Sequence, residues 1–397
     1  MILSVIIVNY QVPYFLELCL HSVRLTLQGL DAEIIVVDNN SADGSAELLR
    51  PLFPEVHWIV NTENEGFSRA NNQGLAAAAG EYILFLNPDT VLPEDFARDC
   101  LTFHQSTPNV GGLGVRMIDG NGQFLKESRR GFPTPWVAFC KLSGLTSLFP
   151  HSRRFSRYYL GYLPAGQPHP ASVLSGACFL VSRTALYQTG PFDETFFMYA
   201  EDIDLSFRLE KAGYTNYYFP GTTIIHFKGE STHKDIRHIR QFYKAMIQFR
   251  RKHFNAGLLR LFRFIAEPAI WLRGGLAAIG GTFARRPNRS KLHRTWLTGD
   301  PAGIARINSA LAASPGNSSA KAAASRQRTP APDELHADEI IYCVGNEFSF
   351  ESAIRALEKK SPHCTASFYF TGSAGKPGSH AVIGSSSRTA RGEIWIL

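Results

Sequence analysis

The sequence predicts an α/β fold in which a mixed, mainly parallel sheet is flanked by helices. The first observation is a series of strand-like apolar runs at 4–10, 33–38, 57–61 and 82–87. The second is that helical stretches lie between them, at about 16–27, 46–52 and 70–79. Such alternation is typical of a parallel sheet with helices on both faces.

A third observation locates the expected site. Polar clusters follow the four apolar runs, starting at Asn9, Asp38, Asn61 and Asn87. Ligands of sheets of this kind bind at the carboxyl ends of the strands. The sequence therefore predicts a ligand site at the edge of the sheet where these clusters meet.

The pattern continues less regularly along the chain. Residues 120–170 are rich in Gly, Pro, Arg and aromatic side chains, which predicts a mobile loop region with short helices. Regular structure resumes at 172–183. We expect a helix at about 202–210, ended by Gly213, and then a strand at 222–226.

Composition shifts divide the chain into four parts: the α/β domain at 1–230, a basic amphipathic helical segment at 231–300, a flexible linker at 301–335, and a small α/β module at 336–397. The linker is predicted because its residues are small, polar and proline-containing. The module has about sixty residues, which is close to the lower limit for an independent core. Its function does not follow from the sequence.

The positive charge of the chain is local. The formal net charge is +7, yet residues 226–294 contain sixteen Lys and Arg against three acids. Charged residues interrupt the apolar stretch within this block, whereas a transmembrane helix needs ~20 predominantly apolar residues. We therefore expect an amphipathic segment lying on an anionic membrane surface, and no nucleic-acid partner because no such motif accompanies the block.

The N-terminal residues and the cysteine pattern predict a cytoplasmic location. The sequence starts at once with an apolar run, without a cationic leader, so we expect a cytoplasmic protein held peripherally at the inner face of the plasma membrane. The six cysteines form no CxxC pair. They are therefore expected to be reduced, mostly buried thiols and not a zinc site or a disulfide framework.

The segment 38–45 places an acid at a strand end, then a turn, then a helix start. The Asp38 carboxylate can accept the N3 proton of a uracil or thymine ring, while Asn40 and Ser41 order the turn. Taken alone, the segment is equally typical of an ordinary N-capping loop.

With its neighbours, this segment resembles glycosyltransferase family 2 over about residues 1–230. The family opens with a strand ending in an Asn-Tyr-like pair, here Asn9-Tyr10, followed by D-x-x-S-x-D-G-S, here 38–45. A subgroup with rhamnosyltransferases and galactofuranosyltransferases adds N-x-G-F-x-x-A-x-N-x-G, which 64–74 matches. The resemblance implies the GT-A (nucleotide-diphospho-sugar transferase) fold. It implies donor-binding roles for Asn9, Asp38, Asn40, Asn64, Gly66, Arg69, Asn87 and Gly176.

The resemblance also implies a divalent metal, Mn²⁺ or Mg²⁺. Asp89 stands where the family carries its D-x-D metal motif, but Asn87 replaces the first acid of the motif. Hard cations take carboxylate oxygens, and a cation neutralises a diphosphate leaving group. His226, at the end of a predicted strand, is the second expected ligand. An ordinary Asn-Pro-Asp turn and a structural histidine are the alternatives.

A catalytic base is expected where the segment 197–204 resembles the family's E-D motif at a helix start. Inverting transfer needs one carboxylate to take the proton of the acceptor hydroxyl. By match of position we assign that role to Asp202, and we expect Glu201 to orient the sugar or the base. Asp204 is expected to be a first-turn acid that favours the helix dipole.

These residues predict an inverting glycosyltransferase that uses a dTDP- or UDP-sugar, with rhamnosyl preferred, and a lipid-linked cell-surface glycan as acceptor. A sugar nucleotidyltransferase is a weaker alternative, because no Gly-rich phosphate loop follows the first strand. An inactive, membrane-associated scaffold of a polysaccharide assembly complex is the other. The presence of Asp89, Glu201 and Asp202 favours catalysis.

Overall fold

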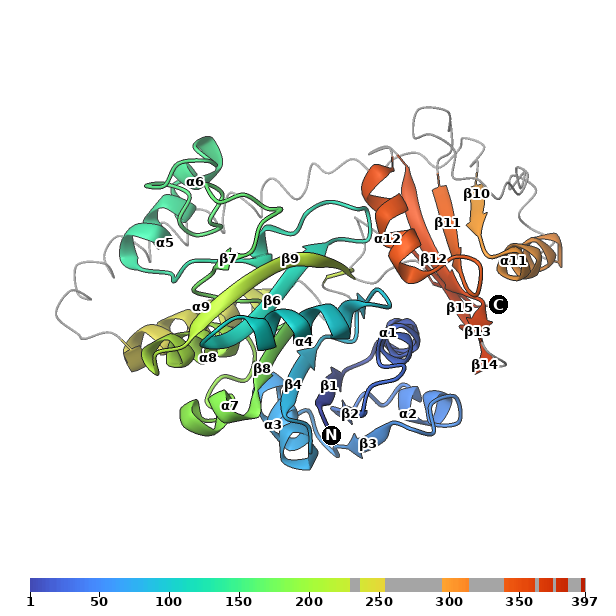
Figure 1. The fold of residues 1–397 in the computed structure, drawn as a ribbon, viewed down its shortest axis with the longest axis horizontal. Coiled ribbons are helices and arrows are strands. Elements are labelled where there is room, and N and C mark those ends of the chain that lie inside the picture. Colours follow the sequence, from blue (N-terminus) through green and yellow to red (C-terminus); the bar gives the residue numbers. More distant parts are fainter. Residues whose placement is uncertain are drawn as a thin grey trace.

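The computed structural model describes residues 1–228, 236–253, 295–313, 339–360, 364–373, 376–384 and 394–396. A nine-stranded sheet forms the core of the main domain, and a five-stranded sheet lies beside it toward the C-terminus (Figure 1). The main sheet has the order β3-β2-β1-β4-β8-β6-β9-β5, with β7 paired to β9.

The elements of the main domain follow the predicted alternation. Its strands are β1 (Leu3–Asn9), β2 (Ala32–Asp38), β3 (His57–Val60), β4 (Tyr82–Leu86), β5 (Thr90–Val91), β6 (Val110–Ile118), β7 (His169–Pro170), β8 (Cys178–Ser182) and β9 (Thr215–His226). Its helices are α1 (Pro13–Thr26), α2 (Ser45–Leu49), α3 (Phe67–Ala77), α4 (Phe96–Ser106), η1 (Lys126–Ser128), α5 (Pro135–Leu142), α6 (Leu145–Leu148), α7 (Arg183–Thr189), α8 (Glu201–Lys211) and α9 (Ile236–His253).

The mixed, mainly parallel sheet is confirmed. Strands β3, β2, β1 and β4 are parallel to one another, while β8 runs antiparallel to both β4 and β6. Strands β1 and β4 are buried along their whole length, because helices cover both faces of the sheet. The register pairs Asn9 with Asp38, so the predicted polar strand ends meet at one edge.

The region 120–170 contains short helices, as predicted: η1, α5 and α6. Strand β6 and helix α4, which precede this region, were not predicted. Strand β9 is also longer than the predicted 222–226, because its first half pairs with β6.

The second sheet changes the predicted division of the chain. It has the order β10-β11-β12-β15-β16 and begins with β10 (Thr295–Gly299), inside the segment predicted to be basic and helical. Helix α11 (Pro301–Ala313) occupies the start of the predicted linker 301–335. The expectation is wrong there, because Ile304 and Ile307 pack into the core of the second sheet. The rest of the linker and residues 254–294 lie outside the described residues.

The other elements of this C-terminal module are β11 (Glu339–Val344), α12 (Phe350–Lys359), β12 (Thr365–Phe370), β13 (Gly372–Ser373), β14 (Lys376–Pro377), β15 (Ala381–Gly384) and β16 (Ile394–Ile396). Strands β10, β11 and β12 are parallel, and β15 and β16 are antiparallel additions. The predicted α/β character of the module is therefore present, and it starts about forty residues earlier than expected.

The C-terminal module packs directly on the main domain. Phe15 of α1 and Phe368 of β12 both contact Phe227, with ring centroids 5.1 and 5.7 Å apart. These rings belong to one apolar cluster that α1, β5 and β9 share with β11, α12 and β12. Because the two units share a core, the small module does not depend on its own interior alone.

Candidate active site

The first part of the site is the corner where β1 and β2 end. The Asn9 side-chain amide donates to Asp38 Oδ1 at 2.8 Å and to the Ser41 hydroxyl at 3.0 Å. The Ser41 hydroxyl in turn donates to Asp38 Oδ1, and the Ser41 backbone N–H donates to Asp38 Oδ2 at 3.2 Å. All three side chains are buried. The structure thus brings Asn9 and Asp38 together, as the strand-end pattern predicts.

The neighbouring residue Asn39, which was not among the predicted site residues, links this corner to the next loop. Its side-chain amide donates to Asn64 Oδ1 at 2.9 Å, and its Oδ1 accepts the backbone N–H of Glu65 at 3.0 Å. Asn40 instead is exposed and has φ +59°. Asn40 therefore contributes to the turn through its left-handed backbone conformation, which asparagine tolerates.

Gly66 allows a close approach between the loop 64–66 and the segment before α8. It has φ +82° and ψ 173°, a region open essentially only to glycine. A β-carbon there would lie 2.6 Å from the Phe197 carbonyl oxygen. The next residue, Phe67, donates its N–H to that same oxygen at 2.7 Å. Gly66 therefore ties the start of α3 to the segment that leads into α8.

Arg69 lies apart from these residues. Its side chain is 53% exposed, and its guanidinium pairs with Glu65 at 2.7 Å and with Glu194 at 3.2 Å. It links the first turn of α3 to the loop that follows α7. The structure does not bring it together with the Asn9–Asp38 corner through any contact that is described.

The residues expected to bind metal converge between β4 and β9. The register opposes Thr90 and His226, and this places Asp89 Oδ1 3.3 Å from His226 Nε2. The Asn87 side-chain amide lies 3.4 Å from the same nitrogen. Asp89 and His226 are both buried. One carboxylate and one imidazole form a donor set that suits Mn²⁺ and, with diphosphate oxygens added, also Mg²⁺.

This donor set is incomplete by itself. Within the described parts of the chain, no group of three or more His, Cys, Asp or Glu side chains is placed to hold a metal. Because Asn87 replaces the first acid of the motif, the described residues here offer one carboxylate and one imidazole.

Asp202, the expected base, lies at the first turn of α8. Its Oδ2 accepts the backbone N–H of Gly176 at 3.2 Å and a hydrogen bond from the Arg130 guanidinium. The Asp202 and Arg130 side chains are both 13% exposed. Burial alone would lower the pKa of Arg130, but attraction to Asp202 raises it overall, so the guanidinium stays charged.

The segment 176–177 joins the expected base to the metal ligands. Gly176 contacts Asp202, and the carbonyl of the next residue, Ala177, accepts the N–H of Asn87 at 2.9 Å. A β-carbon on Gly176 would stand 3.4 Å from the Asp202 β-carbon. One short stretch of backbone therefore contacts both Asp202 and Asn87.

Glu201 differs chemically from its neighbour. It is 7% exposed, and its Oε2 has no hydrogen-bond partner among the described residues. Burial, and then repulsion from Asp202, raise the pKa of Glu201 to about 8. Glu201 is therefore mostly protonated at neutral pH and can donate a hydrogen bond, whereas the neighbouring Asp202 is ion-paired.

Asp204 anchors the helix that carries these acids. It is fully buried and pairs with Arg208 at 2.7 Å, Lys252 at 2.8 Å and His253 at 2.6 Å. Burial tends to raise the pKa of Asp204, but these partners lower it overall. Asp204 is therefore a structural centre and not only a first-turn acid.

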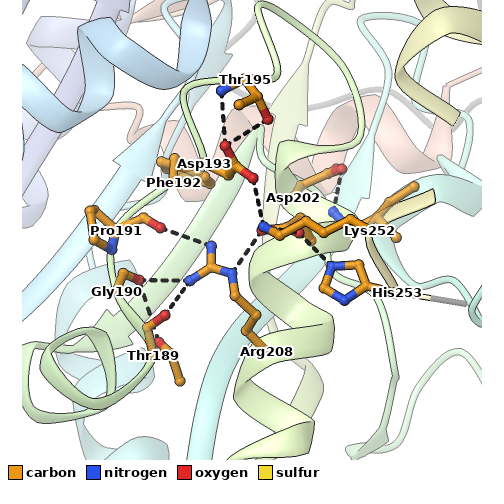
Figure 2. A network of polar contacts seen from close by, with 12 residues as sticks. Thr189, Gly190, Pro191, Phe192, Asp193, Thr195, Asp202, Arg208, Lys252 and His253 are labelled. Carbon is orange, nitrogen blue, oxygen red and sulfur yellow. Dashed lines mark hydrogen bonds and ion pairs between the residues drawn. The ribbon is translucent and has the colours of Figure 1, made fainter. Parts of the chain in front are cut away.

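The partners of Asp204 extend the network to the loop before α8. Figure 2 shows Lys252 of α9 reaching Asp193, at 2.6 Å, and Arg208 reaching the carbonyls of Thr189, Gly190 and Pro191. Helix α9 and this loop thereby fix the position of α8.

A mixed sheet of this kind, with carboxylates and amides gathered at its strand ends, is the GT-A fold of sugar-transferring enzymes. Residues 4–190 match the family described as Glycosyl transferase family 2. The main domain of the chain belongs to this family, and the protein is a glycosyltransferase.

Characterised relatives agree with this class. The chain is 27% identical over 303 residues to an N-acetylglucosaminyl-diphospho-decaprenol L-rhamnosyltransferase of Mycobacterium tuberculosis, covering 73% of this chain and 97% of that protein. It is 30% identical over 217 residues to the low-salt glycan biosynthesis hexosyltransferase Agl10 of Haloferax volcanii, covering 53% of this chain and 62% of the relative.

Among solved structures, a mannosyltransferase of Pyrobaculum calidifontis in complex with GDP-Man and Mn²⁺ is similar, with a TM-score of 0.44 and 18% identity. The match covers 79% of this chain and 81% of that protein.

One further expectation is tested by the structure. All six cysteines are buried and free, as predicted. In the described parts of the chain, no helix is both long enough and apolar enough to span a bilayer.

Proposed function

We propose that this glycosyltransferase moves a sugar from a dTDP- or UDP-sugar to a hydroxyl of a lipid-linked cell-surface glycan, with inversion at the anomeric carbon. The observation that carries the proposal is the placement of the Asp202 carboxylate on Gly176, next to the backbone that holds Asn87 and the Asp89–His226 pair. The short stretch 176–177 therefore contacts both the proposed base and Asn87, beside the proposed diphosphate site.

In the proposed reaction, the acceptor oxygen forms a bond to the anomeric carbon while its proton passes to a carboxylate oxygen of Asp202. The bond between that carbon and the diphosphate oxygen breaks, and the nucleoside diphosphate leaves with the electron pair. Proton removal by a positioned carboxylate contributes ~10²–10⁴-fold to such a step. Arg130 holds Asp202 in place, and neutral Glu201 donates a hydrogen bond to a bound hydroxyl.

Asp89 and His226 would hold the divalent metal, with Asn87 beside them. Bound there, the cation neutralises charge on the diphosphate. The Asn9–Asp38–Ser41 corner is proposed to receive the nucleoside, with Asp38 accepting from the base. The loop 64–66 is proposed to close the donor site, because Asn64 and Gly66 connect the corner to the segment before α8.

The choice of sugar and acceptor is supported by the relative from Mycobacterium tuberculosis, whose name specifies rhamnosyl transfer to a decaprenol-linked acceptor. We extend this to a lipid-linked acceptor here, with the protein held peripherally at the inner face of the membrane. The basic helix α9 adds positive charge for that location.

The experiment that tests the proposal measures nucleoside diphosphate release from a panel of dTDP- and UDP-sugars, with Mn²⁺ or EDTA, in the presence of membrane extract. Metal-dependent release from one donor, lost in Asp202→Asn and Asp89→Ala, is the expected result. Release unchanged by EDTA contradicts the metal assignment. No release and no nucleotide binding with any donor would favour an inactive scaffold.

A further inference from the structure

Exposed apolar side chains gather on helices α5 and α6 and the turn that follows them. Trp136 is 40% exposed, Phe139 39%, Leu148 69% and Phe149 45%. They make up four of the nine large apolar side chains that are exposed in the described residues, within a stretch of fourteen residues. Side chains of this size rarely cluster at the surface of a protein without a partner.

The rings of this region form one continuous surface. Trp136 stacks on Phe139 with ring centroids 5.7 Å apart, and Phe155 lies 6.2 Å from Trp136 and 5.4 Å from Phe149. We name the set Trp136, Phe139, Leu148, Phe149 and Phe155 the aromatic patch. Helices α5 and α6, which carry Trp136, Phe139 and Leu148, lie at the opposite end of the view from the C-terminal sheet (Figure 1).

All Asp, Glu, Lys and Arg residues in the part of the sequence that contains the aromatic patch are basic. Between Glu127 and Asp193 the chain has seven Lys and Arg residues and no acid. Three of the arginines, at 153, 154 and 157, are exposed. The Arg154 guanidinium lies 5.6 Å from the Trp136 ring centroid. Arginine beside exposed Trp and Phe is the combination that suits an anionic lipid headgroup layer above an apolar interior.

We propose that the aromatic patch is a membrane-docking surface that inserts into the interface of an anionic bilayer. Charge complementarity selects this partner, because the exposed arginines match anionic headgroups while the rings match the acyl boundary. A second copy of the chain fits less well. A two-fold contact through the patch would set the arginines of each copy against those of the other.

The position of the patch connects it to the transfer reaction, and this part rests on the proposed function. A cavity of about 550 Å³ borders the patch, lined by Thr146 and Ser147 of α6, by Tyr159, and by Arg129. The residue after Arg129 is Arg130, which binds Asp202. Docking through the patch would therefore set this cavity close to the bilayer, one residue along the chain from the arginine that holds Asp202.

The test uses the full chain and flotation with vesicles of phosphatidylcholine, with and without phosphatidylglycerol. We expect binding to the anionic vesicles, reduced about tenfold or more in the double variant Trp136→Ser/Phe149→Ser. Arg153→Gln/Arg154→Gln is expected to weaken binding to anionic vesicles only. The matched control is Tyr187→Ser, because Tyr187 is a 92% exposed aromatic on α7, outside the patch.

Thermal melts of each variant show whether it is folded, and light scattering gives its oligomeric state. If the folded Trp136→Ser/Phe149→Ser variant floats like the wild type, the patch does not dock on membranes. If that variant instead converts a dimer to a monomer while vesicle binding is unchanged, the patch is an interface between copies. Vesicle binding needs no donor turnover, so failure of the proposed reaction would be seen separately, in the diphosphate-release assay.

Discussion

The carboxylate of Asp202 is held by the backbone of Gly176, whose N–H donates to Oδ2 at 3.2 Å. The Arg130 guanidinium binds the same oxygen, so Asp202 is fixed from two sides before any acceptor arrives. The other carboxylate oxygen, Oδ1, accepts the backbone N–H of the neighbouring residue Ile203 at 2.8 Å. The Asp202 carboxylate is therefore held in a fixed position and can still accept a further hydrogen bond.

Removal of that group gives the first prediction. Asp202→Asn keeps the shape of the side chain but cannot take a proton, so kcat is expected to fall ~10²–10⁴-fold with little change in the KM for the donor. Steady-state rates of diphosphate release measure this. The control is Asp95→Asn, an acid whose side chain is 53% exposed and paired with Arg98. A variant that changes only KM would contradict the assignment of Asp202 as the base.

The second prediction concerns the Asp89–His226 pair. Asp89→Ala and His226→Ala are each expected to weaken the apparent affinity for Mn²⁺ by about tenfold or more, because few protein ligands are available. Titration of Mn²⁺ against nucleoside-diphosphate-bound protein, followed by electron paramagnetic resonance, reads metal binding without turnover. His57→Ala, which changes an exposed histidine on β3, is the control. Equal Mn²⁺ binding in all variants would remove this pair as the metal site.

The strand ends that form the site were predicted correctly from the sequence, because the position of a strand depends on a local run of apolar residues. The apolar runs before Asn9, Asp38 and Asn87 set the strands, and the parallel alternation of strands and helices set their common edge. The pairing of Arg130 with Asp202 joins residues 72 positions apart. No period in the sequence marks such a contact.

The C-terminal module was harder to predict for a similar reason. Strand β10 has only five residues and follows a strongly basic stretch, so composition favoured helix. Its pairing with β11 spans 44 positions. The docking of the module on α1 depends on contacts such as Glu17 with His380, which are 363 positions apart. Sequence reading of local periodicity does not reach contacts of this range.

The third prediction follows from that contact. Glu17 is fully buried in α1 and accepts from the His380 backbone N–H at 3.0 Å and from its ring Nδ1 at 2.6 Å. Burial raises the pKa of Glu17, and the bonds from His380 oppose that rise. His380→Ala is expected to lower the free energy of unfolding by about 1–3 kcal/mol, because a buried acceptor loses its ring donor.

Chemical denaturation at neutral pH measures the change in His380→Ala. His57→Ala again serves as the control, because His57 is exposed and distant in sequence from the module. Unchanged stability in His380→Ala would mean that the ring does not help to hold the module on α1.

The fourth prediction is a pH dependence of stability caused by Glu201. Burial, followed by repulsion from Asp202, raises its pKa from 4.5 to about 8 in the folded protein. Between these values the folded protein keeps a proton that the unfolded chain releases. The free energy of unfolding therefore falls as the pH rises through this window, by at most ~1.4 kcal/mol per pH unit.

Glu201→Gln removes this titration and keeps a neutral donor. Its free energy of unfolding is expected to decline less than that of the wild type between about pH 5 and about pH 9, measured by urea denaturation at several pH values. Glu47→Gln, on α2, controls for the loss of one acid elsewhere. Parallel pH curves for the wild type and Glu201→Gln would contradict a raised pKa at this position.

The last prediction concerns Gly66, where two separate costs act on any side chain. With φ +82° and ψ 173°, the backbone occupies a region that costs a non-glycine residue ~1–3 kcal/mol. A β-carbon would also stand 2.6 Å from the Phe197 carbonyl oxygen, which accepts the N–H of Phe67. Gly66→Ala must therefore push apart the start of α3 and the segment that leads to Asp202.

Gly44→Ala is the matched control, because Gly44 has φ +77° but nothing within 4 Å of a β-carbon. That substitution carries only the backbone cost, about 1 kcal/mol. Gly66→Ala is expected to lose more stability than Gly44→Ala and, in addition, to lower diphosphate release at temperatures where it remains folded. Equal losses in the two variants would show that Phe197 moves at little cost, and then Gly66 would not set the spacing between the loop 64–66 and helix α8.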